Sequence, residues 1–365
     1  MKKKIEIVTS ISFIFILFIG ALSYLWNSPK DFSELENRYL KQYPSFSIDS
    51  FLKGTWTKNI EAYMQDQIIF HDGLVMIHNI KERLLGKIES NGVYFGKNNY
   101  LIGDFKKYDT NILKNNINII NNFSKPVSLM GIPSLVETQK GLLPPWEYHT
   151  SQRQLSNQVK TMLHEKHQWI DAFEFLQNNN EAYYKLDHHW NTQGAYLASQ
   201  KYLKLMRKAT SNYTFYPVTH DFRGTMYAKS GMFHYSGEVM NGVKELEELD
   251  VTVTFEDGRT SNSLFFDKHL TKKNTYTYFL DGNHSYVDIV NHDTENKDTL
   301  LVIKDSFAHN MIPFLVPQYE HIVMIDLRYF HESVSELAKK INADEILMLY
   351  SIESLCTDKN IVYLK

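Results

Sequence analysis

The stretch LLVIKDSFAHNMIPFLVPQYEHIVMI, residues 300–325, decides the fold class that this sequence predicts. It opens with an apolar run at residues 300–303, which is typical of a buried strand, and residues 321–325 repeat that pattern. Residues 310–319, between the two runs, have the pattern of a helix that is interrupted by two prolines. A second helix and a third strand are expected at residues 333–341 and 345–350. This alternation predicts an α/β fold around a parallel sheet with right-handed crossovers.

Ser306 follows the first of these strands and precedes the first of the helices. In open α/β sheets, reactive groups lie just beyond the carboxyl ends of the strands. A helix that begins there also offers free backbone N–H groups that can stabilise a developing oxyanion. Ser306 is therefore a candidate nucleophile. The alternative interpretation is that Asp305 or Ser306 only caps the helix that follows.

The tetrapeptide Asp187-His188-His189-Trp190 supplies the other groups that acyl transfer needs. A helix is expected to begin near Thr192, so the motif lies in the preceding loop, where residues two apart share a side. Asp187 is therefore predicted to orient the ring of His189, whereas His188 points the other way. Trp190 is predicted to be a wall of the pocket. With Ser306, these groups have the roles of a nucleophile, a base and an acid that orients the base.

The same tetrapeptide could open a metal site, because aspartate and histidine are common metal ligands. Such chemistry needs further ligands from other strands, and the sequence shows no matching aspartate-rich motifs at strand ends. The single cysteine, Cys356, excludes both an internal disulfide and a cysteine-based zinc site. The sequence therefore predicts no metal and no cofactor. The formal net charge of −3 argues against a nucleic-acid-binding surface.

The N-terminus differs from the rest of the chain. Three lysines, Lys2 to Lys4, precede the charge-free run Ile7 to Trp26. Roughly 20 apolar residues cross a bilayer, and the positive-inside rule keeps the lysines in the cytoplasm. We therefore expect residues 1–26 to be a transmembrane helix that leaves the rest of the chain outside the cytoplasm. A cleaved signal peptide is the alternative, with a weak cleavage site at Ala21-Leu22-Ser23.

The remaining chain is predicted to form a stalk and one large catalytic domain. Residues 27–48 are mostly polar and contain two prolines, as expected of a stalk. Residues 49–365 form the catalytic domain. Within it, residues 211–274 are rich in threonine, tyrosine, phenylalanine and glycine and are predicted to be a β-rich insertion.

Several motifs together support a family resemblance: DHHWNTQGAY at residues 187–196, KDSF at 304–307, PFL at 313–315 and DLRY at 326–329. In this combination the chain resembles the DHHW family of bacterial cell-surface proteins. That family is similar to the SGNH-hydrolase-like proteins that O-acetylate alginate. The resemblance covers nearly all of the chain beyond the predicted anchor. It implies that Ser306 is the nucleophile, His189 the base and Asp187 the partner of that base.

The resemblance also implies a permuted SGNH-hydrolase-like sheet flanked by helices. In SGNH enzymes the two following strand ends supply oxyanion-hole groups, often glycine and asparagine. Neither residue stands at those positions here, so Arg328 and Ser351 are the predicted oxyanion or substrate-binding donors. Asn283 is a competing donor, although Asp281-Gly282-Asn283 also reads as an ordinary turn.

The favoured function is O-acetyl transfer onto an exported or cell-wall polysaccharide through Ser306, His189 and Asp187. The resemblance implies that a membrane-embedded acyl-exporting partner delivers the acetyl group, because acetyl-CoA is not readily available outside the cell. One alternative is an extracytoplasmic carbohydrate acetylesterase, which uses the same triad and transfers the acyl group to water. Another is a non-catalytic scaffold or glycan-binding component of a polymer-export complex.

Overall fold

The computed structural model describes residues 2–26, 28–33, 38–177, 179 and 181–364. The chain groups into two compact units, which are described separately below. One consists of Met1–Ser90 with Ala228–Tyr235, and the other of Asn91–Tyr227 with Ser236–Lys365. The catalytic domain proposed from the sequence begins at residue 49, whereas the compact unit that contains the large sheet begins at Asn91.

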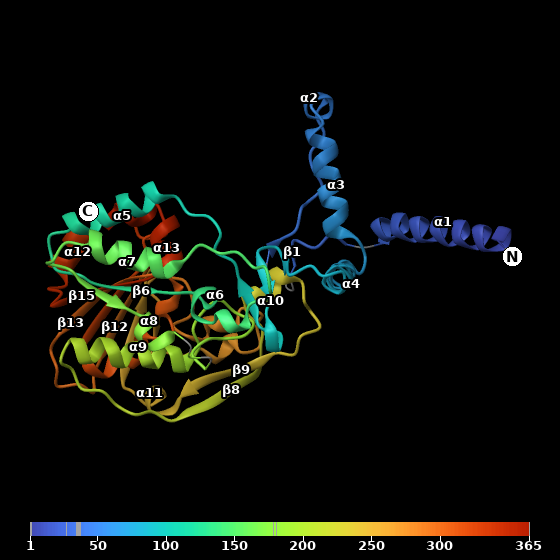
Figure 1. The fold of residues 1–365 in the computed structure, drawn as a ribbon. Helices are drawn as coiled ribbons and strands as arrows, with labels where there is room; N and C mark the ends of the chain where they lie inside the picture. Colours follow the sequence, from blue (N-terminus) through green and yellow to red (C-terminus); the bar gives the residue numbers. More distant parts are fainter. Residues whose placement is uncertain (1, 27, 34–37, 178, 180, 365) are drawn as a thin grey trace. The chain divides into compact units, whose positions relative to one another are not determined.

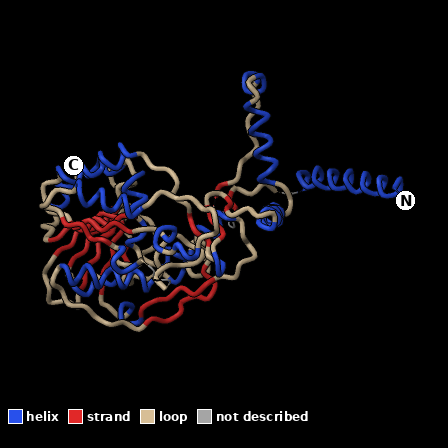
Figure 2. Tube along the Cα trace, in the orientation of Figure 1, coloured by secondary structure: helices blue, strands red, loops and turns tan. Residues whose placement is uncertain are grey.

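The second unit is built around an eight-stranded mixed sheet (Figures 1 and 2). The predicted α/β class is confirmed. The five strands from β14 to β7 run parallel, and β12, β10 and β11 continue the sheet in antiparallel fashion. In sheet order the strands are β11 (Thr260–Ser261), β10 (Val251–Phe255), β12 (Tyr286–Asn291), β14 (His321–Ile325), β13 (Thr299–Lys304), β15 (Glu345–Ser351), β6 (Ser128–Ile132) and β7 (Gln168–Asp171).

The burial of each strand follows its place in the sheet. All residues of β13 are buried, as expected of a central parallel strand that is covered on both faces. Buried and less buried residues alternate along β12 and β10, a pattern typical of antiparallel strands.

The predicted insertion at residues 211–274 is β-rich, and its strands β10 and β11 extend the main sheet. Its other strands, β8 (Phe215–Phe222) and β9 (Glu238–Val243), pair as a separate antiparallel ribbon.

Helices cover both faces of the sheet (Figure 1). One face carries α5 (Thr110–Asn122), α7 (Gln152–Met162), α12 (Val334–Lys340) and α13 (Ile352–Thr357), and the other carries α9 (Thr192–Leu205). A polar side chain before each of these helices accepts a hydrogen bond from a first-turn N–H group, which stabilises the helix start. These capping residues are Asp109, Ser151, Asn191, Ser333 and Ser351.

The predicted helix at residues 310–319 is wrong. The chain between β13 and β14 instead forms the short 3₁₀ turns η5 (Ser306–Ala308), η6 (Ile312–Phe314) and η7 (Val316–Gln318). Pro313 and Pro317 explain the difference, because each lacks the N–H group that an α-helix needs and its ring clashes with the preceding turn. Single 3₁₀ turns tolerate this interruption.

Shorter elements complete the second unit. The strands β4 (Val93–Phe95) and β5 (Leu101–Gly103) pair antiparallel around the turn η1 (Lys97–Asn99). The short helical elements are α6 (Leu135–Thr138), η2 (Lys140–Leu142), α8 (Phe173–Leu176), α11 (Lys244–Glu247), η3 (Asp267–His269), η4 (Thr275–Tyr278) and η8 (Asn360–Leu364).

The first unit is mainly helical. It contains α1 (Lys2–Trp26), α2 (Ile48–Leu52), α3 (Thr55–Gln67) and α4 (His71–Leu84), with the strand pair β1 (Phe32–Ser33) and β2 (Arg38–Tyr39). Two further elements adjoin the unit boundaries, β3 (Glu89–Ser90) and α10 (Thr225–Ser230).

The sequence predicts a transmembrane helix at the N-terminus. Across the part of the chain that the structure describes, no helix combines the length and the apolarity needed to cross a bilayer. Residues 27 and 34–37 of the predicted stalk lie outside the described residues.

Candidate active site

The Asp187–Trp190 motif lies in a short loop that the backbone closes on itself. Tyr183 and Trp190 form an isolated antiparallel bridge, and Asn191 N donates to Ala182 O at 2.9 Å. Asn191 also caps α9, because its Oδ1 accepts from Gly194 N. The loop is therefore fixed at its base by the start of a helix, as the sequence predicts.

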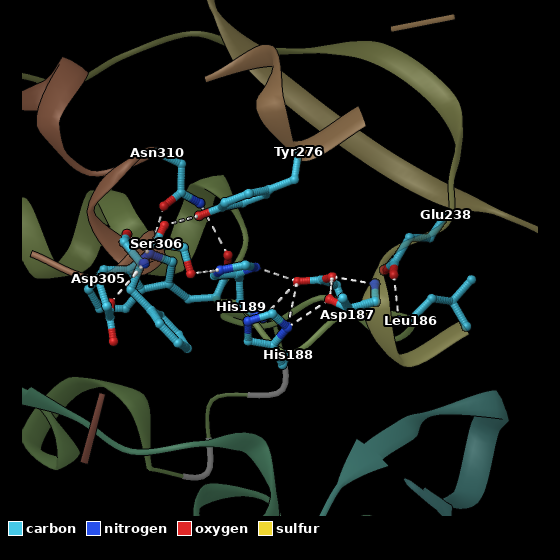
Figure 3. A network of polar contacts seen from close by, with 12 residues as sticks. Leu186, Asp187, His188, His189, Glu238, Tyr276, Asp305, Ser306 and Asn310 are labelled. Carbon is cyan, nitrogen blue, oxygen red and sulfur yellow. Dashed lines mark hydrogen bonds and ion pairs between the residues drawn. The ribbon is translucent and has the colours of Figure 1, made fainter. Parts of the chain in front are cut away.

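Asp187, His189 and Ser306 form one hydrogen-bonded row (Figure 3), which we call the serine row. His189 Nδ1 lies 2.5 Å from Asp187 Oδ1, and His189 Nε2 lies 2.7 Å from Ser306 Oγ. An ionised carboxylate can only accept, so Nδ1 carries the ring proton and Nε2 is free to accept the serine hydroxyl proton. Asp187 and His189 are 3% and 5% exposed, so water competes little for these contacts.

The carboxylate of Asp187 is held from several sides. Its Oδ1 also accepts from His189 N at 2.9 Å, and its Oδ2 accepts from Thr225 N at 2.7 Å and Thr225 Oγ1 at 2.5 Å. Burial alone would raise the pKa of Asp187, but the neighbouring His188 and His189 and these hydrogen bonds hold it well below its usual range. A side chain at Gly224 would lie 2.2 Å from Asp187 Oδ2, so only glycine fits beside the carboxylate.

Ser306 is the first residue of η5, and its neighbour Asp305 carries out the capping. Asp305 Oδ1 accepts from Phe307 N at 3.0 Å, and Asp305 Oδ2 accepts from Ser351 N at 2.8 Å on the adjacent strand end. The Ser306 hydroxyl is therefore not used as a cap and lies against His189 Nε2. This arrangement separates the two interpretations of the motif, because Asp305 caps the turn and Ser306 faces the ring of His189.

Trp190 differs from its prediction as a pocket wall, because it is fully buried. Its Nε1 donates to Phe307 O at 3.0 Å and to Asn310 Oδ1 at 2.7 Å, and Asn310 Nδ2 returns a bond to Trp190 O at 3.1 Å. The indole therefore joins the His189 loop to the turn after Ser306. The amphipathic character of tryptophan explains the change, since its ring fills the interior while its N–H finds a partner.

Tyr276, from η4, covers the ring of His189. Its ring stacks on His189 with centroids 4.0 Å apart and planes 7° from parallel, and its hydroxyl donates to Ser306 O at 3.2 Å (Figure 3). Burial raises the pKa of Tyr276 well above its ordinary value, so the hydroxyl stays a donor. Tyr276 therefore limits rotation of the His189 ring and holds the backbone of Ser306.

Glu238, at the start of β9, supports the loop from its other end. Its Oε1 accepts from Leu186 N at 2.7 Å and its Oε2 from Lys185 N at 2.9 Å, directly before Asp187 (Figure 3). Burial raises the pKa of Glu238 to about 7, with a contribution from the charge of Asp187.

The three predicted oxyanion donors have other hydrogen-bond partners. Arg328 N and Nε donate to Asp326 Oδ1, its Nη2 donates to Asp326 Oδ2, and Asn283 Oδ1 lies 3.5 Å from that Nη2. Ser351 caps α13 through its side chain and donates its N–H to Asp305. Asn283 is exposed and follows a turn in which Asp281 and Gly282 have positive φ angles. The turn interpretation of this segment therefore holds.

A second group of charges, buried except for the partly exposed Arg328, lies at the strand ends next to Ser306. We call Lys304, His309, Asp326 and Arg328 the lysine cluster. Lys304 Nζ donates to His309 Nε2 at 2.8 Å and to Asp326 Oδ2 at 3.2 Å. Burial and the lysine charge hold the pKa of His309 well below its ordinary value, so His309 is a neutral acceptor.

His188 packs on His189, with ring centroids 3.8 Å apart, and its Nδ1 lies 2.8 Å from Thr225 Oγ1. Partial burial and the adjacent His189 lower the pKa of His188, although its side chain is 37% exposed. Ligand atoms of Asp187, His188 and His189 lie within 4.8 Å of one another, a spacing that could hold a metal ion. However, both Asp187 oxygens already accept hydrogen bonds, which a metal would have to displace.

Sequence reasoning missed Thr225, Tyr276, Glu238 and Asn310. The first three come from the predicted insertion and the segment that follows it, and no motif marks them. Asn310 follows Ser306 by one helical turn, but its contact with Trp190 depends on the tertiary fold.

Comparison with known proteins bears on the identity of this region. Residues 166–325 match the family model described as DHHW protein. The predicted resemblance to the DHHW family is thereby confirmed, and the matched DHHW segment contains both Asp187–Trp190 and Ser306. A comparison with curated proteins finds no match.

Solved structures share the fold. The crystal structure of a DHHW family protein from Eubacterium siraeum is 22% identical, with a TM-score of 0.66 over 76% of this chain and 96% of that chain. Bacillus cereus PatB1 with a sulfonyl adduct is 21% identical, with a TM-score of 0.62 over 74% of this chain and 99% of that chain. The fold of about three quarters of this chain therefore occurs in other bacterial proteins.

Proposed function

We propose that this protein is an O-acetyltransferase that acts on a polysaccharide and uses Ser306 as its nucleophile. One observation carries the proposal: the His189 ring lies between Asp187 Oδ1 at 2.5 Å and Ser306 Oγ at 2.7 Å. This spacing fits a nucleophile, a general base and an orienting carboxylate. The DHHW resemblance, with its similarity to proteins that O-acetylate alginate, supports the choice of acetyl and polysaccharide.

In the first half of the reaction, Ser306 Oγ attacks the carbonyl carbon of an acetyl donor. His189 Nε2 takes the hydroxyl proton, and Asp187 stabilises the imidazolium that forms. When the donor bond breaks, His189 returns that proton to the leaving group, and an acetyl ester remains on Ser306. We propose that the Ser306 N–H, at the first position of η5, helps to stabilise the oxyanion.

In the second half, a sugar hydroxyl attacks the acetyl ester. His189 accepts the proton of the sugar and delivers it to Ser306 Oγ, which restores the free serine. The stacked ring of Tyr276 holds His189 in place through both proton transfers. Asp187 and Thr225 fix the ring tautomer, because their hydrogen bonds keep the carboxylate directed at Nδ1.

Product analysis tests the proposal. Purified protein is given p-nitrophenyl acetate as the donor and a sugar oligomer as the acceptor, and acetylated sugar is measured against free acetate. Acetylated sugar that disappears in the Ser306→Ala variant supports the transferase. Free acetate alone, at an unchanged rate when the acceptor is added, supports the acetylesterase alternative.

The scaffold alternative is tested in cells. A strain with Ser306→Ala that still makes the protein should lose polymer acetylation. Unchanged acetylation in that strain would favour a non-catalytic glycan-binding role.

We also propose that the sheet-containing unit works outside the cytoplasm and receives acetyl groups from a membrane-embedded acyl-exporting partner. The lysine-led, charge-free run at residues 7–26 motivates this location. Protease treatment of intact cells should then remove the C-terminal unit. Protection of that unit until the cells are lysed would contradict the proposed location.

A further inference from the structure

Trp146 has an unusual position for a large aromatic residue. Its side chain is 94% exposed, and its backbone has a φ angle of 67°. A bulky residue seldom adopts this left-handed conformation, and such strain tends to occur at functional sites. Tyr148, two residues later, is 67% exposed. The two rings therefore project from one short loop, residues 143–151.

This loop is fixed in place by hydrogen bonds at several points. Tyr94 Oη donates to Tyr148 O at 2.5 Å, and Thr150 N donates to Phe105 O at 2.6 Å. His149 lies between two carboxylates, with Nδ1 2.7 Å from Glu147 Oε2 and Nε2 3.3 Å from the buried Glu137. The rings are therefore presented by an ordered loop, which lowers the entropy cost of binding a ligand.

Residues 133–151, which include α6, η2 and this loop, connect the carboxyl end of β6 to the start of α7. β6 runs parallel to β15, and β15 runs parallel to β13, so this connection leaves the sheet at the edge that carries Ser306. Tyr183 Oη also donates to Pro133 O at 2.5 Å, and Tyr183 pairs with Trp190 in the His189 loop. The segment that leads to Trp146 therefore contacts the segment that carries the proposed base.

We propose that Trp146 and Tyr148 form a binding platform for the polysaccharide acceptor, along the sheet edge that leads to Ser306. This inference rests on the proposed function, because it takes the acceptor to be a polysaccharide. Flat aromatic rings with a polar atom suit a ligand that has both C–H faces and hydroxyl groups. Glu147 follows Trp146 in the sequence, and since its Oε2 pairs with His149, its other carboxylate oxygen can accept a hydrogen bond from a sugar hydroxyl.

The platform is tested by measuring how the Ser306→Ala protein binds polysaccharide, because this variant is expected to lack catalysis. The full chain is run in native gels that contain hydroxyethyl cellulose or glycol chitin, and its retardation gives an apparent dissociation constant. The test variant is Trp146→Asn, because asparagine tolerates a positive φ and removes only the ring. The matched control is Tyr39→Ala, which removes an aromatic side chain that is 81% exposed in the other compact unit.

We expect at least one polymer to retard the Ser306→Ala protein. Adding Trp146→Asn should weaken binding by about tenfold, as expected for one lost aromatic stacking contact, whereas adding Tyr39→Ala should change nothing. The melting temperature of Trp146→Asn should not fall. No retardation in either gel, equal retardation with Trp146→Asn, or equal losses in both variants would overturn the platform. A failure of acetyl transfer would overturn the proposed function and leave this binding result unaffected.

Discussion

The serine row and the lysine cluster both lie at the carboxyl end of β13, and each contains an aspartate and a histidine. In the serine row, His189 lies between a carboxylate and a hydroxyl, so its Nε2 can accept a proton that leaves a nucleophile. In the lysine cluster, His309 Nε2 accepts from Lys304 Nζ, and the carboxylate of Asp326 is bonded to Lys304 and Arg328. Similar residue types therefore form a hydroxyl–imidazole–carboxylate row in one place and a buried ion pair in the other.

The difference depends on what faces the imidazole. A hydroxyl beside Nε2 gives the ring a proton to move, whereas an ammonium beside Nε2 holds the ring neutral and fixed. We infer that the lysine cluster supports the strand ends beneath Ser306 and that the serine row carries out the chemistry. Paired substitutions in the two groups should therefore have different effects, one on rate and the other on stability.

The largest expected effect is that of His189→Ala. Loss of the base should lower acyl transfer by roughly 10³-fold or more, because the members of a triad act as a unit. Some loss of stability is also expected, because His189 is buried and stacks on Tyr276, so the rate is compared at a temperature at which both proteins are folded. His188→Ala is the neighbouring control and should be much milder, since His188 contacts Thr225 and not Ser306. A severe loss of activity in His188→Ala, together with retained activity in His189→Ala, would show that His188 and not His189 is the base.

Replacing either Asp187 or Asp326 by asparagine should separate an effect on the catalytic rate from an effect on the stability of the fold. Asp187→Asn should lower kcat by about 10²- to 10⁴-fold, because the amide favours the wrong tautomer of His189. Asp326→Asn should instead lower the free energy of unfolding by about 3–5 kcal/mol, because it removes the buried partner of Lys304. Steady-state kinetics and urea unfolding on both variants check this contrast. Equal kcat values in the two variants would show that the serine row and the lysine cluster do not differ in their effect on the rate.

Tyr276 should have a moderate effect. Tyr276→Leu removes the ring that stacks on His189 and should raise the barrier by about 0.5–1.5 kcal/mol, or roughly 2- to 10-fold in kcat. Tyr276→Phe keeps the ring and should retain most of the activity. If both variants lose the same amount, then the hydroxyl contact with Ser306 O matters and the stacking does not.

The smallest expected effect is the contribution of Glu238 to the pH dependence of the melting temperature. Its pKa is about 7 in the folded protein and nearer 4.3 in the unfolded chain. The folded state therefore binds the proton more tightly, and stability falls as the pH rises between these values. In Glu238→Gln, the decline of the melting temperature between about pH 5 and pH 7 should be weaker. Identical profiles for the two proteins would show that Glu238 does not titrate in this range.

The elements that sequence analysis predicted correctly depend on short-range patterns. The buried run of β13 and the loop before α9 follow from local periodicity and capping, so Ser306, His189 and Asp187 could be proposed together. The helix at residues 310–319 failed because two prolines outweighed its apolar spacing. Trp190 could not be placed, since an indole beside a site can equally form a wall or an interior anchor.

Residues that enter the site through tertiary packing had no signal in a single sequence. Tyr276 and Glu238 come from segments whose position depends on how β8 and β9 pair and on where η4 packs. The guanidinium of Arg328 appeared free from its spacing alone, but Asp326, two residues earlier, binds it. Local charge pairing of this kind changes the role of a residue without changing the motif around it.

Covalent labelling of Ser306 tests the central claim most directly. The purified protein is treated with a sulfonyl fluoride, and the modified peptide is identified by mass spectrometry in the original chain and in the variants His189→Ala and Ser306→Ala. The account predicts one adduct on Ser306, much slower labelling in His189→Ala and none at that peptide in Ser306→Ala. An adduct at another residue, or acyl transfer that survives Ser306→Ala and disappears with a chelator, would contradict the account and favour a metal at Asp187, His188 and His189.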